Sequence, residues 1–239
     1  HRARYLGLVP LRPVGRLVRF LVIALLGPPL LVFAAVLVAG WFGVAQVDLS
    51  LHAFADAIAA SDPSQQSALS GLSTSALTLI LLATILINSI TGAISAFGEE
   101  VGWRGFLLPT LRPLGTWPAI VLTGVIWGLW HAPLILLGYN YGRSDVLGVL
   151  YMVVLCVLLG ALLGWLRMRS ASVWPAALAH GAFNASSPVV YVLLANPSSG
   201  ISTPVIGWTG WLVLALTIAV LAGAGQYRWT TPTADPQHG

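Results

Sequence analysis

Two long runs without a charged residue constrain this chain more than any other feature. Between Arg19 and Asp48, and again from Pro63 to Gly98, the sequence contains no Asp, Glu, Lys or Arg. A helix needs about 20 mostly apolar residues to cross the roughly 30 Å hydrocarbon core of a bilayer. Because a helix pairs its backbone polar groups within one segment, it is the structure that such runs adopt in lipid.

The composition of the whole chain agrees with a membrane protein. Hydrophobic residues make up 57% of the 239 residues, charged residues make up 8%, and the mean hydropathy is +0.88. A soluble domain carries about 25% charged residues, so these proportions exclude a water-soluble globule. They also exclude intrinsic disorder, which requires low hydrophobicity. The single cysteine, Cys156, excludes a disulfide framework and a multi-cysteine metal site.

Six apolar segments are long enough to be interpreted as membrane-spanning helices. We expect Pro109 to end the second of them, because proline cannot continue a helix without losing a hydrogen bond. The predicted fold is an all-α polytopic membrane helical bundle: one transmembrane domain over residues 1–229, a polar loop at 48–67 and a disordered tail at 230–239. Because the chain begins at His1, we expect N-terminal residues to be missing. The six segments cover residues 20–45, 72–108, 117–138, 146–166, 173–195 and 204–226.

The placement of arginine predicts how the bundle is oriented. All eleven basic residues are Arg. Arg104 lies inside the second predicted span, and the other ten lie outside the spans. If the six spans alternate in direction, nine of these ten lie on one side of the membrane and only Arg143 lies on the other. The positive-inside rule then places both termini in the cytoplasm. This signal accounts for the basic N-terminal segment, so we expect no binding of nucleic acid. The nine residues are Arg2, Arg4, Arg12, Arg16, Arg19, Arg112, Arg167, Arg169 and Arg228.

Five ionisable side chains fall inside the predicted spans, where each costs about 2.5–3.5 kcal/mol and usually marks a function. Glu100 and Arg104 are four residues apart, so they share one helix face and are expected to form an ion pair. Glu99 points about 100° away from that pair. This arrangement favours a supporting role for the pair and a reactive role for Glu99. The five residues, with one polar neighbour, are Glu99, Glu100, Arg104, His131, His180 and Asn184.

Each of these groups also has a purely structural explanation. Glu100 and Arg104 could form a buried ion pair that only locks helices together. His131, which lies beside tryptophan, could be a hydrogen-bonded core histidine. His180 and Asn184, four residues apart, could make polar contacts between helices. Three such groups on three separate predicted spans nevertheless favour one shared site.

A carboxylate, two imidazoles and a carboxamide facing one cavity suit hydrolysis by activated water. Glu99 would take a proton from water, and a histidine would help to position that water. The other histidine and Asn184 would donate hydrogen bonds to the oxyanion. Alternatively, Glu99, His131 and His180 could bind a divalent metal such as zinc, which would acidify the water.

Three other kinds of intramembrane protease lack support in the sequence. The His-Glu-x-x-His motif of zincins is absent. The Gly-x-Ser-Gly motif of serine enzymes is absent as well, since Ser70-Gly71 follows Ala68-Leu69. An aspartyl enzyme needs Asp inside its spans, and all five Asp residues lie in predicted loops or in the tail.

Three motifs in this order resemble those of the CPBP family, the CAAX prenyl proteases and bacteriocin-processing enzymes also called the Abi family. They are Glu99-Glu100-x-x-x-Arg104, an aromatic residue (Trp127) followed by x-x-x-His131, and His180-x-x-x-Asn184. The resemblance covers about residues 75–195. It departs from the family pattern at Trp127, where Phe is commoner.

The resemblance implies an intramembrane endopeptidase, catalogued as a metalloprotease, whose cavity opens to the cytoplasm. In this family Glu99 and His131 would activate water, His180 and Asn184 would form the oxyanion hole, and Glu100 with Arg104 would support the site. The implied partners are a peptide or protein substrate that could be membrane-anchored and the lipid bilayer, in a multi-pass protein of the cell membrane. Six spans are fewer than in the eukaryotic CAAX enzymes, so prenylated substrates are not implied.

Two other kinds of function remain alternatives. A catalytically idle membrane scaffold or immunity protein would keep the fold, although all six motif residues are intact here. A proton-coupled transporter could use the same Glu and His side chains as a proton relay. Such a transporter predicts repeat-like halves, and the sequence has no internal repeat.

Overall fold

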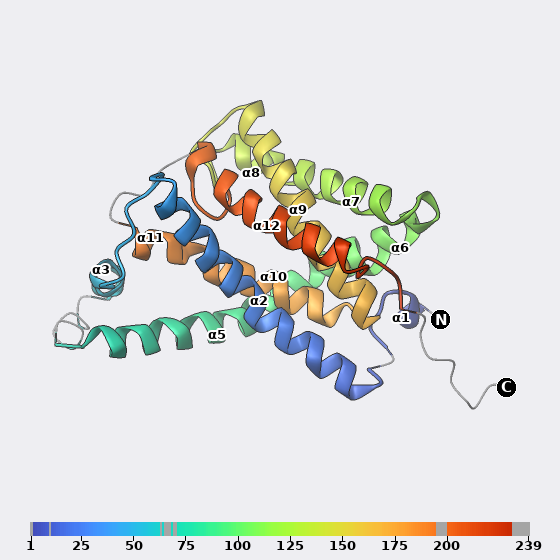
Figure 1. The fold of residues 1–239 in the computed structure, drawn as a ribbon, viewed down its shortest axis with the longest axis horizontal. Helices are drawn as coiled ribbons and strands as arrows, with labels where there is room; N and C mark the ends of the chain where they lie inside the picture. Colours follow the sequence, from blue (N-terminus) through green and yellow to red (C-terminus); the bar gives the residue numbers. More distant parts are fainter. Residues whose placement is uncertain are drawn as a thin grey trace.

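A computed structural model of the chain describes residues 2–9, 11–62, 64, 68, 71–194 and 200–230. The described residues form helices and connecting segments, with no strand and a single isolated β-bridge between Val47 and Leu194. The all-α prediction is therefore confirmed for this part of the chain (Figure 1). The predicted tail lies, from residue 231 on, outside the described residues.

Within the described ranges, three helical stretches are long and apolar enough to cross a membrane. They are α2 (Val14–Trp41), the stretch Thr74–Leu114 that begins with α5 (Thr74–Glu100), and α9 (Val146–Ser170). Two further apolar helices are shorter, namely α7 (Thr116–Trp130) and α12 (Trp208–Gly223). The protein is therefore a helical membrane protein, while the number of six spans stays a prediction.

The second predicted span does not end at Pro109. After α5 the chain continues through a π-helical segment, η2 (Val101–Leu107), then α6 (Leu108–Leu111) and the 3-10 turn η3 (Arg112–Leu114). Pro109 lies in the first turn of α6, where its missing N–H costs little. The expectation that it ends the helix was wrong. The chain instead turns at Gly115, whose φ of 100° suits glycine.

Other predicted segments are divided more finely than expected. The segment 117–138 breaks at His131, between α7 and α8 (Ala132–Leu136). The segment 173–195 contains α10 (Trp174–Ser186), η4 (Ser187–Val189) and α11 (Val190–Leu193). The predicted polar loop holds a helix, α3 (His52–Ser61). The remaining short elements are α1 (Arg2–Tyr5) and η5 (Gly200–Ser202).

Helix α10 lies at the centre of the bundle. It packs mainly against α5 and α2, while α7 packs along α9 and α12 packs against α2 and α9 (Figure 1). Large apolar side chains such as Leu30, Leu79 and Ile94 are exposed on the outer helix faces. Such faces are costly in water but suit a surrounding bilayer.

Two helix pairs in this bundle approach each other closely because glycine lies at the contact. On α7, a Cβ atom at Gly124 or Gly128 would lie 2.6 or 2.5 Å from a Cα atom of α9. On α10, a Cβ at Gly181 would lie 2.7 Å from the Ser89 carbonyl oxygen of α5. Small residues at such contacts let membrane helices pack backbone to backbone.

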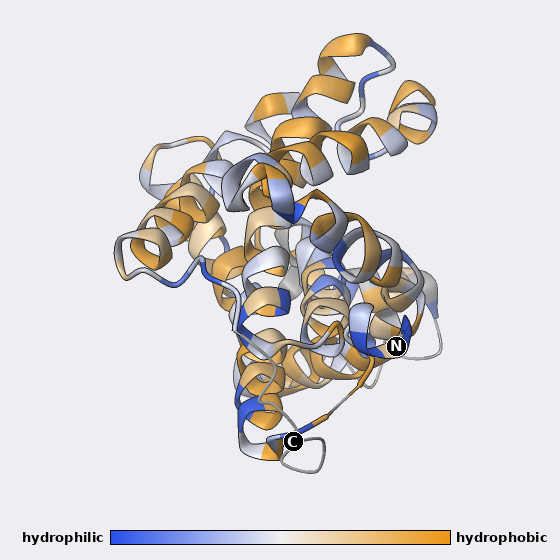
Figure 2. Cartoon of the chain, turned by 90° about the vertical axis from the view of Figure 1, so that its right-hand side faces the viewer, coloured by the Kyte–Doolittle hydropathy of each residue, from blue (hydrophilic) through white to orange (hydrophobic). Residues whose placement is uncertain are grey.

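The end of the bundle that holds both chain termini, called here the terminal end, joins residues 2–8, 110–117, 167–174 and 227–230. Arg167, only 5% exposed, donates from Nη2 to the Tyr5 carbonyl oxygen at 2.9 Å. The Tyr5 hydroxyl lies 2.7 Å from Oγ1 of Thr110, and the Thr230 N–H donates to the Met168 carbonyl at 3.1 Å. Figure 2 faces this end and shows hydrophilic residues near the N-terminus.

The opposite end, called here the distal end, joins residues 40–54, 138–148, 191–194 and 200–208. The Asp48 N–H donates to the Leu193 carbonyl at 2.8 Å. The Tyr141 hydroxyl donates to the Ile206 carbonyl at 3.0 Å. Arg143 lies here and pairs with Asp145, the residue that caps the start of α9. Arg167 at the terminal end and Arg143 at the distal end therefore lie at opposite ends of the described bundle.

Candidate active site

The acidic motif lies where α5 passes into the π-helical segment. Glu99 and Glu100 are the last two residues of α5, and Arg104 lies within η2. Arg104 donates from Nη1 to Oε1 of Glu100 at 2.9 Å, and both residues are 0% exposed. The expected ion pair is therefore present and buried. Single π-helical turns inside helices occur frequently at functional sites.

His180 joins this pair from α10. Its Nδ1 lies 3.0 Å from the same Oε1 atom of Glu100. A carboxylate that is paired with Arg104 only accepts hydrogen bonds, so Nδ1 is the donor and Nε2 of His180 remains for other contacts. The neighbouring Gly181 allows the close approach of α10 to α5. This helix contact brings His180 to the buried carboxylate.

Trp127, on α7, contacts four charged or titratable groups of the site: Glu99, Arg104, His131 and His180. Its indole Nε1 donates to Oε2 of Glu99 at 2.9 Å. The guanidinium carbon of Arg104 lies 4.3 Å from the centre of its ring, a distance typical of a cation–π contact. Its ring also meets the rings of His180 and His131 edge to face, at centroid distances of 5.3 and 5.7 Å.

The role of Trp127 was missed in the sequence, where it counted only as the aromatic residue before His131. The donor and acceptor of its bond to Glu99 are 28 residues apart and lie on different helices. One signal was available, because a tryptophan that is buried needs a partner for its N–H. Trp127 is 2% exposed, and Glu99 is that partner.

His131 lies at the break between α7 and α8. Its Nδ1 lies 2.9 Å from the Trp127 carbonyl oxygen. Because a carbonyl oxygen only accepts, Nδ1 carries the proton, and the neutral ring presents a lone pair on Nε2. The contacts of Gly124 and Gly128 hold α7 against α9 just before this residue.

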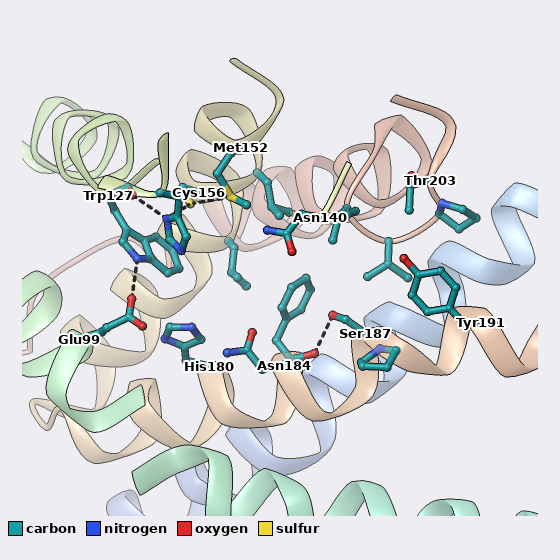
Figure 3. Close-up of a pocket in the computed structure, with 18 residues that line it drawn as sticks. Glu99, Trp127, Asn140, Met152, Cys156, His180, Asn184, Ser187, Tyr191 and Thr203 are labelled. Carbon is teal, nitrogen blue, oxygen red and sulfur yellow. Dashed lines mark hydrogen bonds between the residues drawn. The ribbon is translucent and has the colours of Figure 1, made fainter. Parts of the chain in front are cut away.

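One cavity of about 390 Å³ brings the predicted residues together (Figure 3). Glu99, His131, His180 and Asn184 all line it. Glu99 and His131 are half-buried, His180 is buried and Asn184 is exposed. Glu100 and Arg104 do not line the cavity but lie behind Glu99 and His180. The division between a lining carboxylate and a buried supporting pair thus matches the geometry that the motif spacing predicts.

A metal site is the other use for these side chains, and the arrangement does not fit one. Among the described residues, no three His, Cys, Asp or Glu side chains form a group that could hold a metal ion. His180 already contacts Glu100 through Nδ1, and one oxygen of Glu99 accepts from Trp127. A catalytic zinc needs three protein ligands converging on one point. The described side chains therefore suit direct activation of water better than metal binding.

The cavity of this helical membrane protein brings together a carboxylate, two histidines and an asparagine. These groups can act as a general base and as hydrogen-bond donors, which are the groups that a hydrolase needs. Residues 74–186 match the model of a protein family described as type II CAAX prenyl endopeptidase, Rce1-like. The predicted resemblance to the CAAX prenyl protease family is therefore confirmed over this region, which is slightly less than half of the chain.

A curated relative agrees with the family match. The chain is 39% identical over 49 residues to "CAAX prenyl protease 2" of Methanococcus maripaludis. That similarity covers 20% of this chain and 18% of the relative's length. No solved structure matches the chain significantly.

Proposed function

We propose that this protein is an intramembrane endopeptidase that hydrolyses a peptide bond with water activated by Glu99 and His131. The observation that carries the proposal is the single cavity lined by Glu99, His131, His180 and Asn184. The match of residues 74–186 to a family of CAAX prenyl endopeptidases supports it independently. The substrate is a peptide or protein segment within reach of the bilayer.

In the proposed reaction Glu99 acts as the general base. Trp127 holds one carboxylate oxygen of Glu99 through its indole N–H, which leaves the other oxygen to take a proton from water. His131 accepts a hydrogen bond at Nε2 from the second O–H of that water, which stays intact, because the Nδ1–H of His131 is committed to the Trp127 carbonyl. The resulting hydroxide attacks the peptide carbonyl carbon. Glu99 then delivers the proton to the leaving amine as the C–N bond breaks.

The oxyanion formed on the carbonyl oxygen needs hydrogen-bond donors. The side-chain amide of Asn184 can donate to it directly. His180 can donate from Nε2 only as the imidazolium, whose Nδ1–H then faces the carboxylate of Glu100. Arg104 balances the charge of Glu100 and holds it in place. Each oxyanion donor of this kind contributes about 10²–10³-fold to the rate.

Replacement of Glu99 by Gln tests this mechanism. Gln keeps the size of Glu and can still accept the Trp127 N–H, but it cannot take a proton. We expect a folded protein whose cleavage of an internally quenched peptide library in detergent falls by about 10²-fold or more. The matched control is Asp56→Asn, the same change at an exposed acid of α3, which should cleave like the wild type. Undiminished cleavage by the Glu99→Gln variant would end the proposal.

Asn184→Ala separates the endopeptidase from its two alternatives. The endopeptidase should lose about 10²–10³-fold in cleavage without this oxyanion donor. A scaffold or immunity protein would keep its cellular effect in both variants. A proton-coupled transporter would depend on Glu99 but tolerate the loss of Asn184.

The metal dependence of the reaction is tested by elemental analysis. Because the donors do not form a group that could hold a metal ion, we expect less than stoichiometric zinc in the purified protein. The measurement is the zinc content per chain of the wild type, His131→Ala and His180→Ala. Stoichiometric zinc that both variants lose would establish Glu99, His131 and His180 as the ligand set.

The proposed setting is the cell membrane, crossed by six spans with both termini in the cytoplasm. The arginines gathered at the terminal end support this orientation, together with the lone Arg143 at the distal end. The shorter helices α7, α10 and α12 would cross together with the segments that flank them. In this proposed orientation the distal end faces the non-cytoplasmic side of the membrane.

A further inference from the structure

Four arginines from three separate parts of the bundle gather near the terminal end. Arg16 and Arg19 lie in the first two turns of α2. Arg169 lies at the end of α9, and Arg228 follows α12. The charge of Arg169 is repelled by the charges of the other three, which we call together with it the arginine cluster. Folding therefore brings like charges together, which costs free energy unless an anion lies between them.

The elements that carry the arginine cluster supply no such anion. Helices α2 and α9 and residues 208–228 contain no Asp or Glu. The ion pairs of the described residues involve Arg104, Arg143 and His180 instead. Nε of Arg169 is buried and has no hydrogen-bond partner in the described part of the chain. The positive-inside rule accounts for arginines on one side of a membrane, but not for their convergence from three helices.

An apolar groove runs between the same helices, α2, α9 and α12, which pack side by side (Figure 1). It has a volume of about 270 Å³, and its lining is almost entirely apolar. Residues three or four positions apart share a helix face. Ile23 lines the groove four residues after Arg19, and Leu166 lines it three residues before Arg169. The arginine cluster therefore lies where the groove approaches the terminal end.

This sequence of surfaces, first cationic and then apolar, matches the order of chemical groups in an anionic phospholipid. Arginine binds phosphate oxygens through two parallel N–H donors. Basic pockets between membrane helices bind the head groups of anionic lipids in this way. The groove alone would not select a lipid, because acyl chains surround every apolar helix face in a bilayer. Selection therefore comes from the charge at its end.

The other end of the groove shares a wall with the site cavity. Leu159 and Phe183 line both. Leu159 lies ten residues before Arg169, which is about 15 Å along α9. Phe183 lies on α10 between His180 and Asn184, the two proposed oxyanion donors. An acyl chain in the groove would pack against the back of this wall, and its loss would leave a void there.

We propose that one anionic phospholipid binds with its phosphate on the arginine cluster and one acyl chain in the groove. The bound chain supports the wall formed by Leu159 and Phe183. Lipid binding is independent of the proposed function, whereas the effect of the lipid on cleavage rests on that function. Neither depends on which side of the membrane the terminal end faces.

Native mass spectrometry in detergent tests the binding, with phosphatidylglycerol and phosphatidylcholine that carry the same acyl chains. We expect the wild type to prefer phosphatidylglycerol. Arg16→Gln with Arg19→Gln should weaken that binding about tenfold or more, because two cations are lost. The matched control, Arg2→Gln with Arg4→Gln, removes the same charge from α1, outside the cluster, and should bind like the wild type. Equal affinity for the two lipids, or an equal loss in both double variants, would overturn the site.

A filled groove tests the place of the acyl chain. Gly27 lines the groove, and a Cβ added there meets no atom within 4 Å. Gly27→Leu should therefore fold but bind phosphatidylglycerol about tenfold more weakly, because the new side chain occupies the space. Gly15→Leu, equally open on the same helix but outside the groove, is the control and should keep its affinity. Unchanged affinity in Gly27→Leu, or displacement of the lipid by an equal amount of free glycerol phosphate, would show that the groove holds no chain.

Reconstitution tests the effect on the site. The wild type and both double variants cleave the quenched peptide in vesicles of phosphatidylcholine, with or without added phosphatidylglycerol. We expect the added lipid to raise kcat several-fold in the wild type and in the Arg2 and Arg4 control, but not in Arg16→Gln with Arg19→Gln. Equal kcat of the wild type in both vesicles would overturn the support of the wall. Undiminished cleavage by Glu99→Gln would instead contradict the proposed function, and the binding measurements would still stand.

Discussion

At the scale of single residues, Trp127 connects the two parts of the site. It donates to the carboxylate of Glu99 and lies against the guanidinium of Arg104. Its carbonyl oxygen sets the proton position of His131. One buried side chain therefore orients the proposed base, and its own backbone orients the histidine that would position water.

Trp127→Phe tests this orienting role. Phenylalanine keeps an aromatic face for Arg104 but removes the N–H that holds Glu99. A hydrogen bond to a charged group contributes about 1.5–3 kcal/mol, so we expect kcat to fall about tenfold or more. Peptide cleavage and thermal stability are measured together, with Trp117→Phe at the terminal end as the control. A Trp127→Phe enzyme with wild-type kcat would assign the indole N–H to packing alone.

The buried ion pair predicts a large effect on stability. Arg104→Ala leaves the carboxylate of Glu100 buried without its cation, which costs about 3–5 kcal/mol. We expect a lower folded yield and a lower midpoint of thermal unfolding in detergent. The control is Arg143→Ala, which breaks an exposed pair with Asp145 and should change stability little. Equal stability of the two variants would contradict a supporting role for the pair.

At the scale of helices, the site depends on close contacts between neighbouring backbones. Gly124 and Gly128 bring α7 against α9, and Gly181 brings α10 against α5. His131 and His180 lie within three residues of these contacts along the chain. Any change in helix spacing there would move an imidazole relative to Glu99.

Gly128→Ala tests that dependence with a single added carbon. The new Cβ would lie 2.5 Å from the Cα of Val153, so α7 and α9 must separate. Overpacking of this kind costs about 1–3 kcal/mol. In Gly27→Ala, on α2, the new Cβ meets no atom within 4 Å. We expect a lower unfolding temperature only for Gly128→Ala; equal values would show that the two helices yield freely.

Hydropathy predicted where helices occur but not how they are divided. The uncharged runs were sufficient for α2, α5 and α9, because length and apolar composition determine a span. The break at His131 and the π-helical turns of η2 depend on contacts between distant segments, which local patterns do not contain. The prediction that Pro109 ends a helix was wrong because proline is tolerated in the first turn of a helix, and the sequence alone did not show that α6 begins at Leu108.

The site itself was predictable to a different degree. The free-energy cost of an ionisable side chain inside an apolar span was enough to single out five candidates, namely Glu99, Glu100, Arg104, His131 and His180. The spacing of Glu100 and Arg104 predicted their ion pair. The bond of His180 to Glu100, by contrast, joins residues 80 positions apart and follows only from the packing of α10 on α5.

At the scale of the whole molecule, the two ends of the described bundle differ in charge. Arg167 contacts Tyr5 at the terminal end, whereas Arg143 at the distal end is paired with Asp145. A reporter fusion tests the proposed orientation directly. We expect green fluorescent protein fused after Gly239 to fluoresce, and alkaline phosphatase fused after Gly142 to be active. The reverse pattern would place the terminal end outside the cytoplasm.

The π-helical segment Val101–Leu107 makes the number of residues between the helix segments on either side of it important, because that number sets how they are rotated relative to each other. A π-helical hydrogen bond spans one residue more than an α-helical bond. Loss of one residue here, such as the exposed Gly102, would turn everything downstream by about 100° relative to α5. Glu99 would then face a different side of α7 although every side chain of the site was still present. In an alignment of related chains, a one-residue gap in this stretch would mark a protein in which Glu99 and Trp127 no longer face each other.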